Sequence, residues 1–357
     1  MRLTRTIAAL LVAAILGGCS DDHATKPIAS ARTYRMGFSS FPPRPDPNLL
    51  IPTINSWSAR GDAGLILTDP PWAALLAGRP ADSLIMTNQL GLAGYFRGLG
   101  LRVVVSIDPT NGLDRSSESP ALVAAGRSLS EPAVQALYRD YCTAMDTIIR
   151  PDYLGIASET NLVRALAPAS VYNAVVQASS AAATSIAIAD SAAKLYFTVQ
   201  VETAWGKLAG PGGAYVGIDQ DLADFGWNAA LGLSSYPYLG GFADPDSIPL
   251  DYYSRLQAGK LIQFPMLVVE GGWPSDTVGV ASNPQMQSRY IARHASIQDQ
   301  AGTVAWFQIT YTDIDEAAWG FPPGSLTPFA FNGLVDTNFN PKPARTTWDG
   351  IFARPRR

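Results

Sequence analysis

Eight short β-rich runs alternate with segments of helical periodicity from residue 33 to the end of this 357-residue chain. Most of the runs are apolar for four to six residues and are bounded by Gly, Pro, Asp or Ser. Short apolar runs between turns are typical of strands buried on both faces, and their alternation with helices indicates a parallel sheet. Eight such units in roughly 325 residues predict an α/β fold, a (β/α)8 TIM barrel, as a single domain over residues 33–357.

The expected elements follow from these patterns. The predicted strands are Tyr34–Ser39, Gly64–Thr68, Arg102–Ile107, Tyr153–Ala157, Leu195–Val201, Ala230–Ser235, Met266–Val269 and Thr303–Ile309. The predicted helices are Leu49–Trp57, Ser83–Phe96, Glu131–Ile149, Val171–Ala193, Asp251–Leu256, Gln285–Gln300 and Arg345–Phe352. A doubly wound open sheet is the alternative. It is disfavoured because it usually has fewer strands and a glycine-rich first turn, and neither GxGxxG nor GxxxxGKS/T occurs, so we expect no cofactor.

The first residues have the pattern of an export signal. Arg2 and Arg5 precede an apolar stretch, Ile7–Leu16, and Gly17-Gly18-Cys19 follows. This segment resembles the bacterial lipobox, which implies a signal peptide over 1–18, a lipid on Cys19 that anchors the protein to a membrane, and a tether over 19–32. The expected location is the bacterial cell envelope, with the outer membrane favoured because serine, not an acid, follows Cys19. An ordinary signal peptide ending in Cys, or an uncleaved anchor, is the alternative.

Composition limits the remaining possibilities. The net charge of −4 disfavours a nucleic-acid partner. Only two cysteines occur, and lipidation of Cys19 leaves Cys142 without a partner for an internal disulfide. We expect a monomer whose core is stabilised by apolar burial.

Acidic residues end five of the eight predicted strands. Active sites of α/β barrels lie at the carboxyl ends of the strands, where loops follow them. Acidic residues at such tips therefore indicate a functional site, although for each of them a structural role in a salt bridge or a helix cap is the alternative. The tip residues in chain order are Ser39 or Ser40, Asp69, Asp108, Glu159, Glu202, Tyr236, Glu270 and Gln308.

Tryptophans also follow four of the predicted strands closely. They are Trp72, Trp205, Trp273 and Trp319. Flat aromatic rings stack on the C–H faces of sugars, so acids and tryptophans on one mouth are typical of a carbohydrate site. For any single tryptophan, a place in the core is the alternative.

Two of these glutamates match a known arrangement. Glu159 ends the fourth strand and Glu270 the seventh, which resembles the large clan of retaining glycoside hydrolases built on (β/α)8 barrels. Ser234-Ser235-Tyr236-Pro237 and Glu270-Gly271-Gly272-Trp273-Pro274 are most similar to segments of the arabinogalactan endo-β-1,4-galactanases, glycoside hydrolase family 53. The resemblance implies an endo-acting, retaining hydrolase of a β-linked glycan. Glu270 would be the nucleophile, Glu159 the acid/base, and Tyr236 the residue that orients Glu270.

One position departs from the clan pattern. The clan usually has Asn directly before the acid/base, where it binds the sugar 2-hydroxyl, and this chain has Ser158 there; Asn161 is nearby but is expected to point elsewhere. This departure puts the usual 2-hydroxyl contact in doubt. The expected substrate-binding residues are Asp69, Trp72, Asp108, Ser158, Glu202, Trp205, Trp273, Gln308 and Trp319.

Two other functions remain open. Ser158 is compatible with a non-catalytic glycan-binding protein on a glycosidase barrel. Asp108, Glu159 and Glu202 could instead bind Mg²⁺, as in enolase-like barrels, but that chemistry needs a Lys or His base and no such residue ends a strand. The only histidines are His23 in the tether and His294, expected to be solvated on an outer helix. This scarcity disfavours zinc and Ser-His-Asp chemistry, so we expect no metal.

Overall fold

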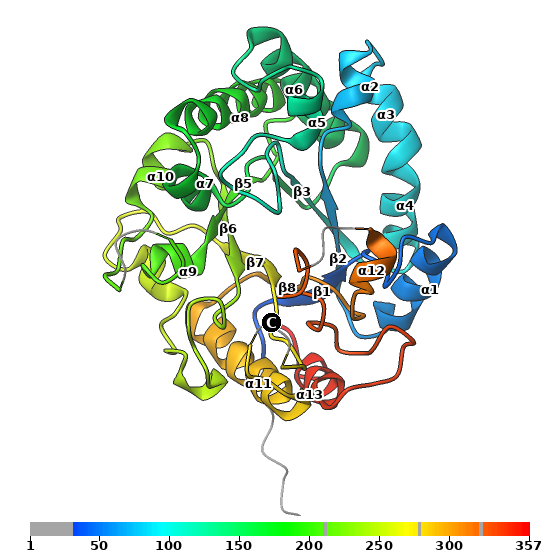
Figure 1. Ribbon diagram of the computed structural model, residues 1–357, viewed down its shortest axis with the longest axis vertical. Coiled ribbons are helices and arrows are strands. Elements are labelled where there is room, and N and C mark those ends of the chain that lie inside the picture. Colours follow the sequence, from blue (N-terminus) through cyan, green and yellow to red (C-terminus); the bar gives the residue numbers. More distant parts are fainter. Residues whose placement is uncertain (1–30, 210–212, 278–279, 321–323) are drawn as a thin grey trace, which may run out of the picture.

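The protein is a closed barrel of eight parallel strands, as seen in a computed structural model that describes residues 31–209, 213–277, 280–320 and 324–357. Each strand pairs with its neighbours in the sequence, and β1 closes the barrel on β8 (Figure 1). The strands are β1 (Arg35–Ser39), β2 (Ala63–Thr68), β3 (Arg102–Ile107), β4 (Tyr153–Gly155), β5 (Leu195–Gln200), β6 (Ala230–Ser235), β7 (Met266–Gly271) and β8 (Ala305–Gln308). The predicted (β/α)8 fold is confirmed.

Helices surround the barrel (Figure 1). The α-helices are α1 (Pro47–Ser58), α2 (Trp72–Leu76), α3 (Ala81–Asn88), α4 (Leu90–Gly98), α5 (Pro120–Ala124), α6 (Pro132–Ala144), α7 (Thr160–Leu166), α8 (Ala169–Ala189), α9 (Val201–Ala204), α10 (Asp219–Asp224), α11 (Pro284–Ala301), α12 (Glu316–Trp319) and α13 (Pro343–Phe352). A π-helical turn, η1 (Met145–Ile149), and two 3-10 turns, η2 (Pro245–Ser247) and η3 (Ser254–Gln257), complete the set.

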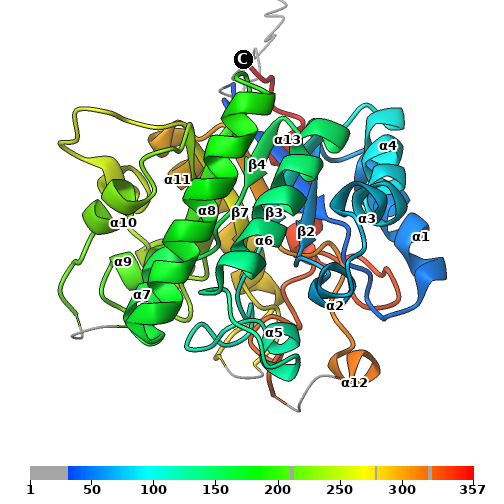
Figure 2. The ribbon, with the colours of Figure 1, turned by 90° about the horizontal axis from the view of Figure 1, so that it is seen from above.

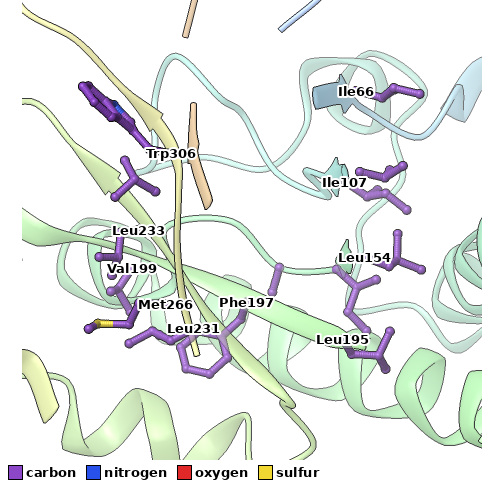
Figure 3. Packing of buried hydrophobic residues seen from close by; sticks show 14 of the residues in the cluster. Ile66, Ile107, Leu154, Leu195, Phe197, Val199, Leu231, Leu233, Met266 and Trp306 are labelled. Carbon is purple, nitrogen blue, oxygen red and sulfur yellow. The ribbon is translucent and has the colours of Figure 1, made fainter. Parts of the chain in front are cut away.

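The core has two layers because successive strand side chains point to opposite faces. The larger layer fills the space between barrel and helices; Figure 3 shows Phe197 and Val199 of β5 near Leu231 and Leu233 of β6, and Leu195 of β5 near Leu154 of β4. The smaller layer lies inside the barrel and is made of strand residues alone. Its buried members are Ala63, Leu65, Val104, Tyr196, Ala230, Leu267, Val269, Ala305 and Phe307.

The two ends of the barrel differ. Figure 2 shows α2, α5, α7 and α12 at the end where the strands finish, and the C-terminus at the opposite end. The first described residues lie at that opposite end too, because Arg32 forms a β-bridge with Arg356. The predicted signal peptide and nearly all of the tether lie outside the described residues. Among the described helices, none has the length and hydropathy of a membrane span.

The predicted strands all exist, with bounds shifted by at most two residues, but two helix predictions were inaccurate. The single helix expected over Ser83–Phe96 is divided at Gln89, where φ is −120° between α3 and α4. The helix expected over Asp251–Leu256 is only the 3-10 turn η3. Six residues between two loops are too few to nucleate a stable α-helix on their own.

The prediction of a solvated His294 is wrong. The residue is on α11 as expected, but its side chain is buried against Trp306 of β8, with ring centroids 4.7 Å apart. Burial lowers the pKa of His294 to about 3, and its Nε2 lies 2.5 Å from the Tyr253 hydroxyl. His294 is therefore a neutral residue of the core and is not part of the group of strand-tip residues.

Candidate active site

Glu159 lies four residues after the end of β4 and is the N-cap residue of α7. Its backbone has φ 44° and ψ 47°, in the left-handed region that costs a non-glycine residue on the order of 1–3 kcal/mol. Two contacts hold this turn: the Glu159 N–H donates to Thr198 Oγ1 at 2.6 Å, and the Glu159 carbonyl accepts from the first turn of α7. A strained residue fixed by its neighbours at a strand tip is a feature of functional sites.

A β-bulge in β7 determines where Glu270 points. β7 pairs regularly with β6 up to Val268 and then skips Val269, so that Glu270 stands opposite Ser234. Val269 belongs to the interior layer, and strict alternation would turn Glu270 outward. The extra residue of the bulge instead places Glu270 on the inner side of the barrel, which Ser234 shares with Ala230 of the same layer.

Tyr236 connects β6 to this carboxylate. Its hydroxyl donates to Glu270 Oε1 at 2.8 Å. Burial, and then the charge of Glu159, raises the pKa of Glu270 to about 7, while the Tyr236 hydrogen bond opposes that rise. The two carboxylates are therefore close enough to interact electrostatically, as the resemblance implied for a catalytic pair.

An arginine that the sequence did not single out ties the third and fourth strand tips together. Arg115, in the loop after β3, donates from Nε to Glu159 Oε2 at 2.7 Å and from Nη1 to Asp108 Oδ2 at 2.5 Å. Asp108 Oδ1 accepts from both the N–H and the hydroxyl of Thr110 at 2.9 Å. Asp108 thus shapes its own loop and holds Arg115, which in turn anchors Glu159.

One oxygen of each glutamate of the pair stays free. Arg115 occupies Glu159 Oε2 and Tyr236 occupies Glu270 Oε1. Neither Glu159 Oε1 nor Glu270 Oε2 has a hydrogen-bond donor among the described residues, and neither is sealed from solvent. Each carboxylate therefore has one oxygen that fixes its position and one that is available to a ligand.

The prediction that Glu202 contacts substrate is wrong, because its side chain is fully buried. Glu202 accepts from the hydroxyls of Ser235 at 3.0 Å and Tyr252 at 2.9 Å, from the backbone N–H of Tyr236 at 3.0 Å, and from the Gln200 amide. Burial raises its pKa to about 6 despite these bonds. Glu202 instead fixes the backbone of Tyr236, whose hydroxyl reaches Glu270.

Trp72 and Trp273 do not offer a face to a sugar, contrary to prediction. Their side chains are 1% and 0% exposed. Trp72 stacks on Tyr138, and Trp273 stacks on Tyr290, with ring centroids 6.1 and 5.3 Å apart. Both are core residues between the strands and the outer helices.

The other two tryptophans are half-buried. Trp205 stacks on Tyr252 at 4.9 Å and has the guanidinium of Arg255 4.8 Å from its ring centroid. Trp319, in α12, stacks on Phe41 of the loop after β1 with centroids 4.4 Å apart. Trp319 therefore lies at the end of the barrel that carries the two glutamates, in an aromatic pair shared by two loops.

Gln308 is buried, whereas Asp69 is accessible to solvent. Gln308 is buried, and strand alternation places it on the same outer side as Trp306, so the prediction that it binds substrate is wrong. Asp69 remains accessible, and its carboxyl has no hydrogen-bond partner among the described residues. The dense protein around that carboxyl, and then the charge of Asp108, raises the pKa of Asp69 to about 6.

Ser158 and Asn161 confirm the departure from the clan pattern. The Ser158 hydroxyl is buried and lies 3.5 Å from the carbonyl oxygen of Ile107. Asn161 uses both ends of its amide on the backbone of Gln200, at 2.8 Å each. As expected, Asn161 points elsewhere and does not replace the missing asparagine.

The alternative Mg²⁺ site does not fit these contacts. A guanidinium, Arg115, already lies between Asp108 and Glu159, where the cation would have to bind. Glu202 is occupied by four donors on the other side of the mouth. In the described part of the chain, His, Cys, Asp and Glu side chains form no group that could hold a metal ion.

Comparison with protein-family models and with curated protein sequences gives no match. Solved structures, however, share the fold. An exo-β-1,4-mannosidase, Op5Man5 from Opitutaceae bacterium strain TAV5, superposes with a TM-score of 0.65 over 91% of this chain and 60% of its own, at 15% identity. A β-glucuronidase from an uncultured Clostridium sp. gives a TM-score of 0.59 over 90% of this chain and 50% of its own, at 12% identity.

A GH53 catalytic domain from Ignisphaera aggregans is also similar, with a TM-score of 0.55 over 75% of this chain and 78% of its own, at 17% identity. This chain thus spans about half to three fifths of the first two structures and most of the third. At these identities the likeness shows a shared barrel fold, and the chemistry must be argued from the residues described above.

Proposed function

We propose that the protein is a retaining glycoside hydrolase that cleaves a β-linked glycan by double displacement. The observation that carries this proposal is the pair of electrostatically interacting carboxylates, each with one anchored and one free oxygen. Double displacement needs two carboxyl groups about 5–5.5 Å apart with opposite tasks. The similar solved structures support the proposal at the level of class, since they are an exo-β-1,4-mannosidase, a β-glucuronidase and a GH53 catalytic domain.

Glu270 is the nucleophile in this proposal. Tyr236 holds Oε1 at 2.8 Å, which leaves Oε2 to attack the anomeric carbon and form a glycosyl-enzyme. Glu159 Oε1 then protonates the leaving oxygen, and in the second step takes a proton from water. Once Glu270 is glycosylated its negative charge is gone, so Glu159 faces a neutral ester during the second step.

The substrate contacts are the accessible groups of the same mouth. Asp69 provides an unpaired carboxylate for sugar hydroxyls, and the Trp319–Phe41 pair provides an aromatic surface at the rim. An aromatic pair at the rim suits stacking on an internal segment of a chain, so we propose endo action. Among polysaccharides, β-1,4-galactan is the first candidate because of the sequence segments around Tyr236 and Glu270.

The experiment is hydrolysis of a panel of galactan, mannan, xylan and mixed β-glucans, with the anomer of the first product determined by NMR. We expect a β product. Glu270→Gln should abolish hydrolysis, and Glu159→Ala should spare aryl glycosides with good leaving groups far better than polysaccharides. Glu131→Gln, at a surface ion pair with Arg127, is the matched control and should leave the rate unchanged. An α product, or full turnover by Glu270→Gln, would exclude the mechanism.

A second function is favoured by one contact. To donate a proton, Glu159 must first be protonated, which would replace its buried ion pair with Arg115 by a neutral acid beside a guanidinium, and breaking such a pair costs on the order of 3–5 kcal/mol. A glycan-binding protein without catalysis has no such requirement. It would bind an oligosaccharide from the panel without hydrolysing any, and Glu270→Gln would leave that affinity largely intact.

A further inference from the structure

A second hollow lies at the opposite end of the barrel, where the strands begin. Its volume is about 440 Å³, which is within the range of small-molecule sites. Small side chains of the interior layer, Ala63, Val104 and Ala305, form part of its lining. The first residues of several strands and the C-terminal segment surround it, so it shares no residue with the mouth that holds Glu159 and Glu270.

The lining of this hollow is strongly cationic, although the whole chain has a net charge of −4. Its single acidic side chain is Asp152. Its five cationic side chains are Arg35, Arg102, Lys194, Arg356 and Arg357. Such a concentration of one sign around a concave surface focuses the field and attracts anions.

The protein does not neutralise these cations itself. Asp152 Oδ2 accepts from the Val103 N–H at 3.0 Å, and Asp152 Oδ1 accepts from Arg102 at 3.2 Å. In the ranges that the structure describes, the guanidinium groups of Arg35 and Arg356 make neither an ion pair nor a hydrogen bond. The one acidic side chain of the lining therefore pairs with Arg102, and no carboxylate lies within ion-pair distance of Arg35 or Arg356 among the described residues.

The charge of Arg35 is destabilised by its surroundings. It is half-buried at the start of β1, in register with Ala305 of the interior layer. Burial lowers the pKa of Arg35, and repulsion from Arg356 and Arg102 lowers it further. An anion between these groups would replace repulsion by attraction, so the hollow is electrostatically complementary to a negatively charged ligand.

We propose that this hollow is a binding site for a phosphate-bearing group. Several guanidinium groups converge on it, and a phosphate offers more oxygens to such forks than one carboxylate does. The volume leaves room for an organic substituent on the phosphate, and the Tyr153 ring, 5.4 Å from Lys194 Nζ, gives that substituent an apolar wall. The site is independent of the glycosidase proposal, because none of its residues takes part in that mechanism.

The phosphate could come from a soluble phosphate ester or from a phospholipid head group. The chain enters the barrel at this end, where the Arg32 N–H donates to the Pro355 carbonyl at 2.8 Å. A membrane anchor on the preceding segment would bring this face close to lipid, whereas a soluble ester needs no anchor. The two sources therefore require separate measurements.

The test is calorimetric titration of the full chain with glycerol 3-phosphate and with inorganic phosphate, and co-sedimentation with vesicles of phosphatidylglycerol or phosphatidylcholine. We expect saturable binding of at least one phosphate probe, and Arg35→Gln should weaken it by at least tenfold, about the loss of one charge-assisted hydrogen bond. Lys194→Gln, at an exposed position, should weaken it too and tests the site if Arg35→Gln unfolds. Arg139→Gln, an exposed arginine paired with Asp140 on α6, should bind as the wild type does.

Each outcome decides the proposal. Binding of the soluble esters with no preference for phosphatidylglycerol assigns the site to a soluble ligand. Binding of phosphatidylglycerol vesicles alone, lost in Lys194→Gln, assigns it to a lipid head group. No binding of any probe, or equal loss in Arg139→Gln, overturns the proposal.

Discussion

At the scale of single residues, the protonation of the site depends on two carboxylates, Glu159 and Glu270, and on the side chains that hydrogen-bond to them. Tyr236 stabilises the charged form of Glu270 by a hydrogen bond, whereas burial and the charge of Glu159 destabilise it. The result is a pKa of about 7 for Glu270, so it carries a proton below neutrality. A nucleophile must be ionised, and activity should therefore be lost as the pH falls through about 7.

Tyr236→Phe tests this balance. Removal of a hydrogen bond that favours the carboxylate should raise the pKa of Glu270 further, by about one unit. The acid limb of kcat/KM against pH should move to higher pH by that amount, with about a tenfold lower rate on the acid side. The measurement is a pH profile with an aryl glycoside. Tyr95→Phe, whose hydroxyl donates to Asn55 Oδ1 between the outer helices α4 and α1, is the control. An unmoved limb in Tyr236→Phe would refute the assignment.

Much of this residue pattern could be predicted from the sequence, because it depends on strand order. Glu159, Glu270 and Tyr236 each follow a recognisable strand, so counting strands placed them on one mouth. Arg115 could not be found this way, because its loop conformation depends on contacts with Asp108 and Glu159 that are distant in sequence. The one available signal was a lone arginine in the long loop after the third strand, whose tip is acidic.

At the scale of elements, the barrel depends on close packing inside it. Tyr196 of β5 is fully buried in the interior layer, and its hydroxyl donates to the Val105 carbonyl at 2.9 Å. Gly155 of β4 leaves the space that this ring occupies, since a Cβ at Gly155 would lie 2.5 Å from Tyr196 Cε2. The glycine is therefore needed because any side chain at this position would collide with the Tyr196 ring. Gly155 is the last residue of β4, and Glu159 follows four residues later.

Gly155→Ala should therefore destabilise the protein by about 1–3 kcal/mol, the usual cost of overpacking a core. The measurement is urea unfolding followed by circular dichroism. Gly94→Ala is the matched control, because Gly94 is exposed in α4 and a Cβ there would meet nothing within 4 Å. That change should stabilise by about 0.5–1 kcal/mol through helix propensity. Equal stability of Gly155→Ala and the wild type would show that the ring can move aside.

Elements that bury a continuous apolar run were predictable, and those set by local context were not. β3 and β6 have the predicted bounds because their runs are closed by turn residues. The bulge at Val269 leaves no mark in the sequence, since it arises from how β7 pairs with β6. The burial of Trp72 and Trp273 could likewise not be predicted, because a tryptophan that follows a strand can lie either at the mouth of the barrel or in the core.

At the scale of the whole molecule, different charged groups gather at the two ends of the barrel. The carboxylates lie where the strands finish, while Arg32 and Arg356 bridge at the end where the strands begin. The segment between Cys19 and Arg32 would reach at most about 40 Å when fully extended. If Cys19 carries a lipid, as we propose from the sequence, the cationic end lies toward the membrane and the glutamates face away from it.

Cys19→Ala tests the lipid anchor on which this orientation depends. We expect wild-type protein in the membrane fraction of a bacterial host, with a lipid mass on the peptide that begins at Cys19, because acyl chains inserted in a bilayer supply membrane affinity. Cys19→Ala should lose the lipid and leave that fraction, with the unfolding midpoint unchanged, since the cysteine precedes the barrel. Cys142→Ala is the control, because Cys142 is buried in the core and should leave lipidation intact. Unlipidated wild type, or a Cys19→Ala protein still bound to the membrane, would show that the anchor is elsewhere.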